Sequence, residues 1–234
     1  RRTLDEVRLQ PGQRVLEIGC GWGALAEAAA QEFGARVTGV TLSREQLVWG
    51  QRRMLQAGLV DNVELRYQDY RDLPAQHSGE PFDAIVSIEM FEAVGREYWR
   101  GYFEMLRDCL KPGGLACIQT ITLREDLFTR YLRSTDFIQQ YIFPGGLLPS
   151  IPAFEQEAQR AGLVVESHMA FGRDYAETLR RWRQSFEHQI DTVRAQGFDE
   201  RFVRIWRFYL AYCEAAFDTG NTDVVQFTLR RPLS

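Results

Sequence analysis

The chain has 234 residues, of which 45% are hydrophobic, 26% charged and 12% aromatic, and its formal net charge is −4. A chain of this length and composition can bury a large apolar core as one α/β domain without the help of disulfide bonds. The slightly acidic balance excludes the electrostatic footprint of a nucleic-acid-binding protein and a strong overall attraction to anionic lipid.

Cysteine usage and apolar runs bear on the compartment of the protein. The cysteines follow no metal-binding or redox spacing, which is typical of reduced thiols in a reducing cytosol; they are Cys20, Cys109, Cys117 and Cys213. No apolar run approaches the roughly eighteen residues that a membrane span needs, and no signal peptide precedes the first predicted strand. The chain begins without Met, and we expect a further segment before Arg1. We expect a cytoplasmic protein without a metal site, and peripheral contact with the inner membrane face stays open.

Up to about residue 120, short apolar runs alternate with amphipathic segments. The predicted strands are residues 14–18, 35–40, 62–67, 82–88 and 115–121. The predicted helices are residues 24–32, a helix that opens at Ser43, and residues 97–110, and a tight turn is predicted at 111–114. Alternation of this kind implies a parallel sheet covered by helices on both faces.

After the fifth strand the pattern changes. Residues 123–141 look helical, and Phe143-Pro144-Gly145-Gly146 interrupts the chain. A strand is predicted at 163–168, aromatic-rich helices at 175–189 and 199–217, and a last strand at 223–229. The seven predicted strands indicate an α/β fold with a seven-stranded, mostly parallel sheet.

A glycine-rich loop, residues 17–23, lies where the first strand meets the first helix. Glycines there let the backbone approach a ligand, and the helix N-terminus points at that ligand. The spacing also satisfies the fingerprint of dinucleotide-binding proteins, which requires an acidic residue about twenty positions further on. Val40, Thr41 and Leu42 stand at that place, so the sequence argues against NAD.

Glu17 indicates a different cofactor. An acidic residue two positions before the first glycine resembles the first motif of class I methyltransferases, where the acid orients the methionine end of S-adenosylmethionine; a purely structural turn is the alternative. By the same resemblance Asp69 would hydrogen-bond adenine, although a turn cap also explains it. Gln46 could reach the ribose or complete a capping box with Ser43. The predicted cofactor-binding residues are Glu17, Gly19, Cys20, Gly21, Thr41, Leu42, Gln46, Asp69, Tyr70 and Ile88.

Longer strings resemble the cyclopropane-fatty-acid synthase family from about residue 12 to the C-terminus. They are VLEIGCGWG at 15–23, GVTLS at 39–43, IEMFEAVG at 88–95, YIFPGGLLPS at 141–150 and DYAETL at 174–179. The resemblance implies a class I methyltransferase (Rossmann-like) fold, with residues 1–234 as a single methyltransferase domain. In that fold one strand is antiparallel and the last strand inserts beside the fifth. It also implies that residues 122–160 and 175–217 form a helical lid for an acyl substrate over the carboxyl ends of the strands.

The resemblance further implies a reaction on an unsaturated fatty acyl chain of a phospholipid. The methyl carbon of S-adenosylmethionine adds across the double bond, and the carbocation that results loses a proton to give a cyclopropane or a methyl- or methylene-branched product. In the family a bound bicarbonate is understood to take that proton. Its ligands map onto Glu92 and Tyr175, whereas the family's histidine is Gln119 here and a second histidine is Ala93. We predict that Glu92, Gln119 and Tyr175 meet beside the reacting methyl group.

Other interpretations of these residues stay open. Glu92 could be a first-turn carboxylate favoured by a helix dipole, and Tyr175 a core tyrosine. Six aromatic residues could line an acyl tunnel or pack in a core; they are Trp182, Phe186, Trp206, Phe208, Tyr209 and Tyr212. The chain could instead be a small-molecule N- or O-methyltransferase, or a non-catalytic protein that binds lipid or S-adenosylmethionine. No nucleic-acid partner is expected, and oligomerisation stays open.

Overall fold

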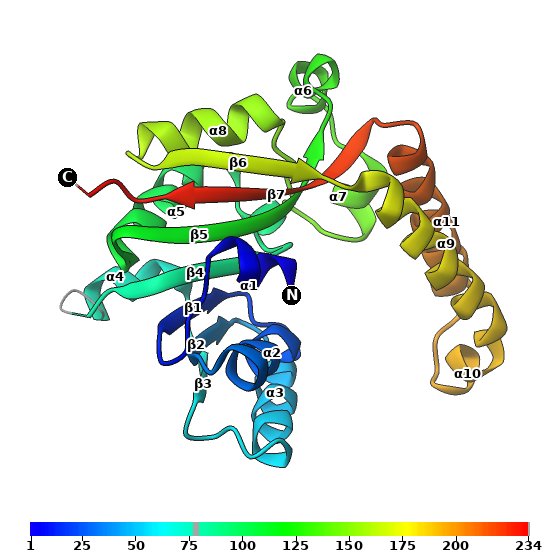
Figure 1. Ribbon diagram of the computed structural model, residues 1–234. Coiled ribbons are helices and arrows are strands. Elements are labelled where there is room, and N and C mark those ends of the chain that lie inside the picture. The colour runs from blue at the N-terminus through cyan, green and yellow to red at the C-terminus, as the bar shows by residue number, and fades with distance from the viewer. Residues whose placement is uncertain (77–79, 234) are drawn as a thin grey trace. The chain divides into compact units, whose positions relative to one another are not determined.

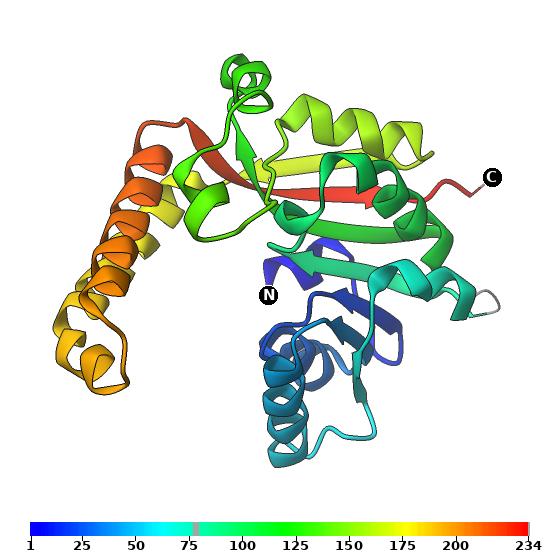
Figure 2. The same ribbon diagram turned by 180° about the vertical axis from the view of Figure 1, so that it is seen from behind.

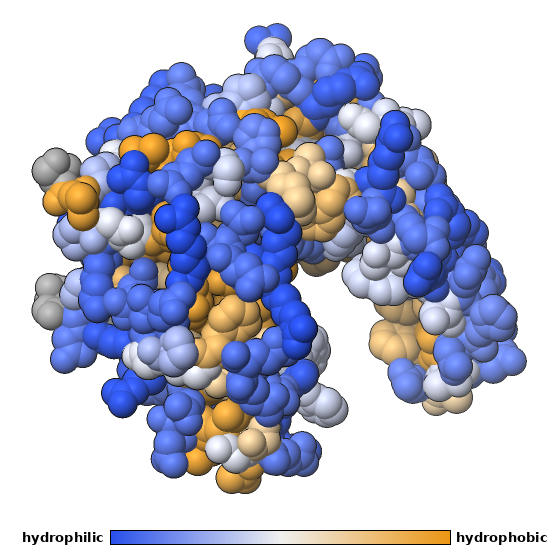
Figure 3. Space-filling view, in the orientation of Figure 1, coloured by the Kyte–Doolittle hydropathy of each residue, from blue (hydrophilic) through white to orange (hydrophobic). Residues whose placement is uncertain are grey.

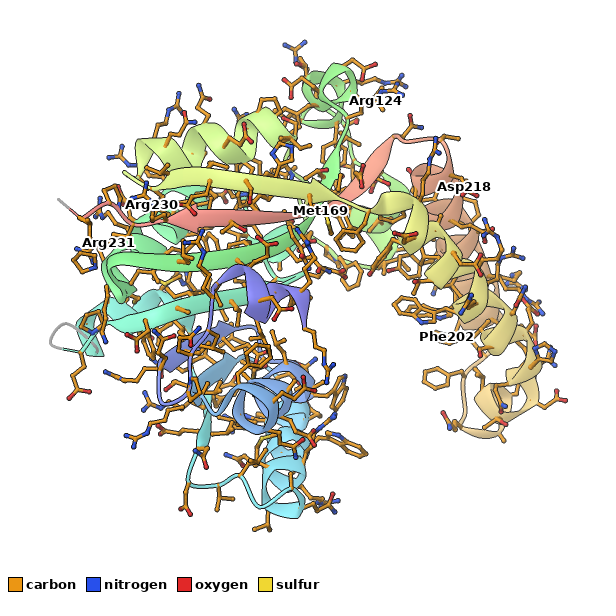
Figure 4. The ribbon with its side chains drawn as sticks, in the orientation of Figure 1. Arg124, Met169, Phe202, Asp218, Arg230 and Arg231 are labelled. Atoms are coloured by element: carbon orange, nitrogen blue, oxygen red, sulfur yellow. The ribbon has the colours of Figure 1, made fainter. Side chains whose placement is uncertain are left out.

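The structure of the chain is a computed structural model that describes residues 1–76 and 80–233 (Figure 1). The chain divides into two compact units. The first unit comprises Arg1–Thr120, Ala153–Met169 and the chain from Gln226 onward, and the second comprises Ile121–Pro152 and Ala170–Val225. Figure 4 labels Met169 near the end of β6 (Val164–Ala170), where the chain passes from the first unit to the second.

The first unit is built on a seven-stranded sheet with the order β3-β2-β1-β4-β5-β7-β6. Its strands are β1 (Arg14–Ile18), β2 (Arg36–Thr41), β3 (Val63–Tyr67), β4 (Phe82–Ile88), β5 (Leu110–Leu123), β6 (Val164–Ala170) and β7 (Thr222–Arg230). Its helices are α1 (Arg2–Glu6), α2 (Ala24–Phe33), α3 (Arg44–Gln56), α4 (Leu73–Gln76), α5 (Trp99–Cys109) and α8 (Ile151–Arg160), with 3₁₀ turns η1 (Tyr70–Asp72), η2 (Phe91–Ala93) and η3 (Arg96–Tyr98). The last residues of β5 and β6 and the first residues of α8 and β7 belong to the second unit.

The strands of the sheet follow the predicted topology. Strands β3, β2, β1, β4 and β5 pair in parallel, whereas Figure 1 shows the arrow of β7 pointing the opposite way to that of β6. The predicted seven-stranded, mostly parallel sheet with the last strand beside the fifth is therefore confirmed. On β1, Glu17 lies opposite Gly39 of β2 on one side and Val86 of β4 on the other. Because the strand order reverses between β1 and β4, ligands are expected at the carboxyl ends of these two strands.

Two different apolar cores pack against the two faces of the sheet. Helices α1 and α2 lie on one face and α4 and α5 on the other, as the opposite views show (Figures 1 and 2). Small and branched side chains such as Ala29 and Val37 fill the first core. The second is aromatic: the ring centroid of Phe91 lies 5.0 Å from that of Tyr102 and 5.2 Å from that of Phe154. This aromatic core fixes the segment that follows β4, where predicted site residues stand.

The predicted tight turn at 111–114 is wrong, because these residues belong to β5. The parallel register of β4 and β5 shifts there, from Phe82 opposite Leu110 to Ala84 opposite Leu115. The shift is held from the far end of the chain: Gly113 N donates to Arg231 O at 2.9 Å, and Arg231 N donates to Gly114 O at 3.0 Å. Figure 4 labels Arg231 at the end of β7. Pairing with a distant strand holds the Pro-Gly-Gly stretch in the sheet, although Gly113 has a φ of +80°, and a local turn signal does not reveal that pairing.

The second unit is mainly helical. Its helices are α6 (Glu125–Tyr131), α7 (Phe137–Tyr141), α9 (Gly172–His188), α10 (Ile190–Ala195) and α11 (Glu200–Asp218). The continuous helix predicted over 123–141 is wrong, because Asp136 forms a capping box with Gln139 and starts a new helix there. The break at Phe143-Pro144-Gly145-Gly146 and the two long aromatic-rich helices are confirmed, the latter with α10 between them.

Helices α9 and α11 pack side by side along most of their length (Figure 1). Their apolar contact contains Leu179 and Leu210, both buried. On the polar side Glu214, whose side chain is 14% exposed, accepts from Arg180 Nε at 3.1 Å and from Arg183 Nε at 3.0 Å. The apolar seam and the shared carboxylate hold the two helices as one hairpin.

Candidate functional site

The glycine loop after β1 adopts a backbone that only glycine takes readily. Gly19, Gly21 and Gly23 have φ values of +79°, +51° and +81°, in the left-handed region. A Cβ on Gly19 would lie 2.9 Å from Met90 Cγ, so the loop touches the segment after β4. A Cβ on Gly21 would meet no protein atom within 4 Å, so the backbone there is open to a ligand. The loop thus meets the requirement for close approach of a ligand at the switch point of the sheet.

Glu17 is the buried acid at the base of this loop. Its side chain is 4% exposed, and its Oε2 has no hydrogen-bond partner among the residues that the structure describes. Burial raises the pKa of Glu17 to about 8, an effect that a hydrogen bond from the backbone of Ala26 partly offsets. A buried carboxyl group with an oxygen to spare is destabilising by itself and is well suited to a cationic ligand group. The residues therefore fit the ammonium group at the methionine end of S-adenosylmethionine.

The loop after β2 holds the predicted residues Thr41, Leu42 and Gln46. Ser43 caps α3 by accepting from Gln46 N at 3.2 Å, as predicted. The side chain of Gln46 does not close a capping box; its Oε1 lies 3.1 Å from Thr41 Oγ1 and accepts from that hydroxyl. Leu42 is 60% exposed. Ribose binding by Gln46 stays a prediction. The exposed, apolar side chain of Leu42 lies beside the loop and is the kind of surface on which a flat ring packs.

Asp69 and Tyr70 follow β3. Both carboxylate oxygens of Asp69 accept from Arg71, with Oδ2 at 2.6 Å from Nη2 and Oδ1 at 2.9 Å from the backbone N. These bonds lower the pKa of Asp69, and they make it the cap of η1. Tyr70 is half-buried, and its ring stacks edge-on against Tyr102 at 5.5 Å. Adenine binding by Asp69 would therefore share the carboxylate with Arg71, and it stays a prediction.

Cys20 and Ile88 complete the predicted cofactor-binding set. The side chain of Cys20 is packed within the core, and this burial raises the pKa of its thiol to about 12. The backbone N–H of Cys20 donates to Val40 O at 3.0 Å and closes the loop. Ile88 ends β4 and lies opposite Gln119 of β5. A cofactor-binding role for either residue stays a prediction.

The three predicted catalytic residues are divided between the units. Glu92 lies in η2 and Gln119 near the end of β5, both in the first unit, whereas Tyr175 lies on α9 in the second. Tyr175 packs against the core of its own unit, with its ring centroid 5.0 Å from that of Phe217. A meeting of Glu92, Gln119 and Tyr175 stays a prediction.

Glu89 is a candidate site residue that the sequence analysis did not single out. It directly follows β4 and has a φ of +51°, and the only other non-glycine residue with positive φ among those described is Arg8. Its carboxylate Oε1 accepts from Gln119 Nε2 at 2.8 Å, and its backbone N donates to Gln119 O at 2.9 Å. A non-glycine residue in this conformation is strained and needs support from its surroundings. The signal in the sequence was a charged residue at the carboxyl end of a buried strand.

The aromatic residues predicted for an acyl tunnel or a core divide into residues that pack in the core and residues that are exposed, and a tunnel stays a prediction. Phe186, Trp206 and Tyr209 pack against the core of the second unit. Trp182, Phe208 and Tyr212 are exposed, by 51%, 52% and 38%. Figure 3 shows an apolar area at the end of the hairpin that carries α10, where the rings of residues 198 and 202 stack at 4.3 Å. The second unit thus presents aromatic surface beyond its own core.

We name the aromatic group formed by the half-buried Phe137 and the exposed Phe208 and Tyr212 the aromatic surface. The ring centroid of Phe208 lies 4.6 Å from that of Phe137 and 5.8 Å from that of Tyr212. Contiguous apolar side chains at a surface are a common feature of sites for apolar ligands. This group is the candidate contact for an acyl chain within the second unit.

Residues 1–76 and 80–233 contain neither a metal-binding cluster nor a membrane-spanning helix. No three His, Cys, Asp or Glu side chains gather there as a metal site would require. Within the same residues no helix is long and apolar enough to cross a membrane.

Similarity to known proteins extends over nearly the whole chain. A family model described as mycolic acid cyclopropane synthetase matches residues 1–227. The chain is 44% identical over 231 residues to the tuberculostearic acid methyltransferase UfaA1 of Mycobacterium tuberculosis, covering 98% of this chain and 53% of the relative. It is 37% identical over 231 residues to the cyclopropane-fatty-acyl-phospholipid synthase of Escherichia coli, covering 99% and 56%. The chain therefore spans about half the length of the curated relatives it matches.

A solved structure agrees with the sequence comparisons. The crystal structure of mycolic acid cyclopropane synthase CmaA1 complexed with SAH and CTAB matches with a TM-score of 0.88 at 30% identity, over 98% of this chain and 81% of that chain. The class I methyltransferase fold predicted from the sequence is confirmed by this match. Because the family model reaches almost from end to end and the solved relative shares the fold, this chain belongs to the mycolic acid cyclopropane synthetase family.

Proposed function

We propose that this chain is the catalytic region of an S-adenosylmethionine-dependent methyltransferase that acts on the double bond of an unsaturated fatty acyl chain. Glu17 carries the proposal, because a buried carboxyl group with an unpaired oxygen beside a left-handed glycine loop needs a cationic ligand group. Family membership supplies the class of reaction. The solved relative is described as complexed with SAH, which supports the same cofactor class.

Several residues of the first unit would take part in binding the cofactor. Gly21 leaves room for the ligand beside the backbone, and Glu17 pairs with its ammonium group. Leu42 offers an exposed apolar contact beside the loop, and Asp69 a polar one after β3. The glycine loop opens α2, whose N-terminus favours the carboxylate end of the ligand.

S-adenosylmethionine supplies an electrophilic sulfonium methyl group. The π electrons of the alkene form the new carbon–carbon bond as the carbon–sulfur bond breaks, which leaves a positive charge on the acyl chain. Loss of a proton from the added carbon closes a cyclopropane, and the same loss after a 1,2-hydride shift along the acyl chain gives a methylene branch. Loss of a proton from a neighbouring chain carbon gives a methyl-branched alkene. The chain must therefore exclude water and place negative charge and a proton acceptor near the strand ends.

The substrate is an acyl lipid in this proposal, and a phospholipid is its most specific form. The relatives include a tuberculostearic acid methyltransferase and a cyclopropane-fatty-acyl-phospholipid synthase, which share acyl chemistry and differ in product. The aromatic surface of Phe137, Phe208 and Tyr212 supports an apolar substrate, because half of the Phe208 side chain is open to contact. A lid role for the second unit belongs to the same proposal.

The surroundings of Gln119 do not suit a bound bicarbonate. By family resemblance this position donates a hydrogen bond to the anion, yet here Gln119 Nε2 donates to the carboxylate of Glu89. A second anion beside Glu89 would be repelled by it. The proposed function therefore does not require bicarbonate, and Glu92 retains its place as a predicted polar residue of the site.

A small-molecule N- or O-methyltransferase is the second candidate. The engagement of Gln119 by Glu89 favours it mildly, because methyl transfer to nitrogen or oxygen needs no anion-held base. The aromatic surface favours the acyl substrate instead. The strained backbone of Glu89 argues against a non-catalytic protein, because strain of this kind is concentrated at functional sites.

The decisive experiment combines the purified chain with methyl-labelled cofactor and either unsaturated phospholipid vesicles or a panel of small amines and phenols. We expect label in the lipid fraction and an acyl mass gain of one CH₂ unit. Saturated phospholipid is the control, because it offers no double bond. Label only in the small-molecule panel would replace the acyl proposal with the second candidate.

A further inference from the structure

A chain of buried polar side chains connects the N-terminal helix to the end of β4. Gln226 Nε2 donates to Thr3 Oγ1 at 3.1 Å and to Gln119 Oε1 at 2.9 Å. Gln119 Nε2 in turn donates to Glu89 Oε1 at 2.8 Å. Thr3, Gln119 and Gln226 are all buried. Four segments of the first unit, α1, β7, β5 and the end of β4, therefore meet through one line of hydrogen bonds.

The direction of these hydrogen bonds is set by the charge of Glu89. An ionised carboxylate only accepts hydrogen bonds, so Gln119 must turn its Nε2 toward Glu89. The Oε1 of Gln119 then faces Gln226 and accepts a hydrogen bond from Gln226 Nε2. Gln226 Oε1 is left buried without a hydrogen-bond partner among the described residues. A buried amide oxygen in that state is destabilising, and local costs of this kind are typical of functional sites.

The backbone of Glu89 adds a second local cost. Its φ of +51° is unfavourable for a residue with a Cβ, and the bond from Glu89 N to Gln119 O at 2.9 Å holds it there. Gln119 thus forms two hydrogen bonds with Glu89: its backbone oxygen accepts from Glu89 N, and its side-chain amide donates to the Glu89 carboxylate. Met90, the next residue, lies against the glycine loop, since a Cβ on Gly19 would meet its side chain.

We infer that Gln226 is a positioning residue that fixes the Glu89 carboxylate at the switch point through the amide of Gln119. The inference rests on the proposed function, in which positive charge develops near the carboxyl ends of β1 and β4. A carboxylate held at one place stabilises such charge without reorganisation. Gln226 contacts Gln119, which lies 107 positions away in the sequence, and it acts through that contact.

The first test reverses the polarity at position 226. In Gln226→Glu an ionised carboxylate would accept where Gln226 donates, so the Gln119 amide turns its oxygen toward Glu89 or loses a partner. We expect kcat to fall roughly tenfold or more, with the KM for the cofactor unchanged within about twofold. Gln226→Met removes the donor without reversing the polarity and should cost less. Gln196→Glu, the same change at an exposed position, is the control.

The second test measures coupling in stability, which does not depend on activity. Gln226→Glu and Glu89→Gln are each expected to lower the Tm by roughly 4–8 °C. A glutamine at 89 can donate to a reversed Gln119 amide, so the double variant should lose clearly less than the sum. Its kcat should stay low, because the carboxylate at 89 is gone.

Additive Tm losses, or an unchanged kcat in Gln226→Glu, would overturn the inference. The two proposals fail in different ways. If the unmodified chain transfers no methyl group to any acceptor while the Tm coupling is present, the proposed function fails and the hydrogen-bonded line stands. If methyl transfer is present and the coupling is absent, the proposed function stands and Gln226 has no positioning role.

Discussion

Glu17 shows how burial changes the chemistry of a single carboxyl group. Its pKa of about 8 in the folded chain contrasts with an ordinary value of 4.5, and burial is the main cause. Between these two values folding takes up a proton, so the free energy of unfolding falls as pH rises from about 4.5 to about 8. The ionised carboxyl group is then the form that a bound ammonium group stabilises.

We therefore predict a pH-dependent stability that one substitution removes. From pH 5.5 to 8.5 the unliganded chain should lose stability by an amount on the order of 3 kcal/mol, whereas Glu17→Gln should be nearly flat over that range. The measurement is urea unfolding at several pH values. S-adenosylhomocysteine should flatten the slope of the unmodified chain, since its ammonium group favours the charged carboxylate. An equal slope in Glu17→Gln would assign the effect to other groups.

Gly21 is the second residue with a role that a substitution can isolate. Its φ is +51° and a Cβ there would meet no protein atom, so Gly21→Val should add backbone strain and fill the ligand's space. Calorimetry with S-adenosylhomocysteine should show binding lost in this variant. Gly58→Val is the matched control, because Gly58 also has a positive φ and open space around it. Gly58 follows the C-terminal end of α3, away from the glycine loop. Equal loss of binding in both variants would mean that strain alone is responsible.

At the scale of elements, α11 combines a core face and an exposed aromatic face. Leu210 is 2% exposed and belongs to the core of the second unit, whereas Phe208, two positions earlier, is 52% exposed. Neighbouring positions on a helix point in different directions, so each face can be changed separately. The separation lets substrate contact be distinguished from folding.

Phe208→Ala should raise the KM for the acyl lipid several-fold and change kcat little, because it removes apolar contact with the substrate. Leu210→Ala should instead destabilise the chain by about 2–5 kcal/mol and lower the amount of folded enzyme. Vesicle-based kinetics and urea unfolding of both variants check the two outcomes. An unchanged KM in Phe208→Ala would remove the aromatic surface from the substrate site.

At the scale of the whole molecule, the predicted catalytic residues come from two units. Glu92 and Gln119 belong to the first unit and Tyr175 to the second, and their action on one reacting group is a prediction. Residues that act on one reacting group are strongly non-additive when they are removed together. Kinetics can therefore test a shared site.

Glu92→Gln and Tyr175→Phe should each lower kcat on the order of a hundredfold, and the double variant should fall little further. Gln119→His should cost less than Glu92→Gln, because a neutral imidazole also offers one donor and one acceptor. Tyr141→Phe, an exposed tyrosine of the second unit, is the control. Multiplied losses in the double variant would place Glu92 and Tyr175 in separate roles.

The order of elements and the glycine loop were predictable because local patterns encode them. Apolar runs and turn residues gave the strands and most helices, and the glycine spacing with Glu17 marked the loop after β1. The family strings added the fold class and the position of the last strand beside β5. Errors arose where long-range pairing overrides a local signal, as at 111–114, where hydrogen bonds with Arg231 hold Gly113 and Gly114 in β5.

The chemistry around Gln119 was decided only in three dimensions. The sequence marks Gln119 as a departure from the family's histidine, but its partners Glu89 and Gln226 are 30 and 107 positions away. Hydrogen bonds between side chains depend on which strands become neighbours and on the register between them, and no local pattern carries that information. The order of the elements, the glycine loop and the family can be read from the sequence alone, because local patterns encode them. The tertiary structure decided that Glu17 is buried with an oxygen unpaired and that Glu89 is strained and held by Gln119, because both depend on contacts that form only when the sheet is assembled.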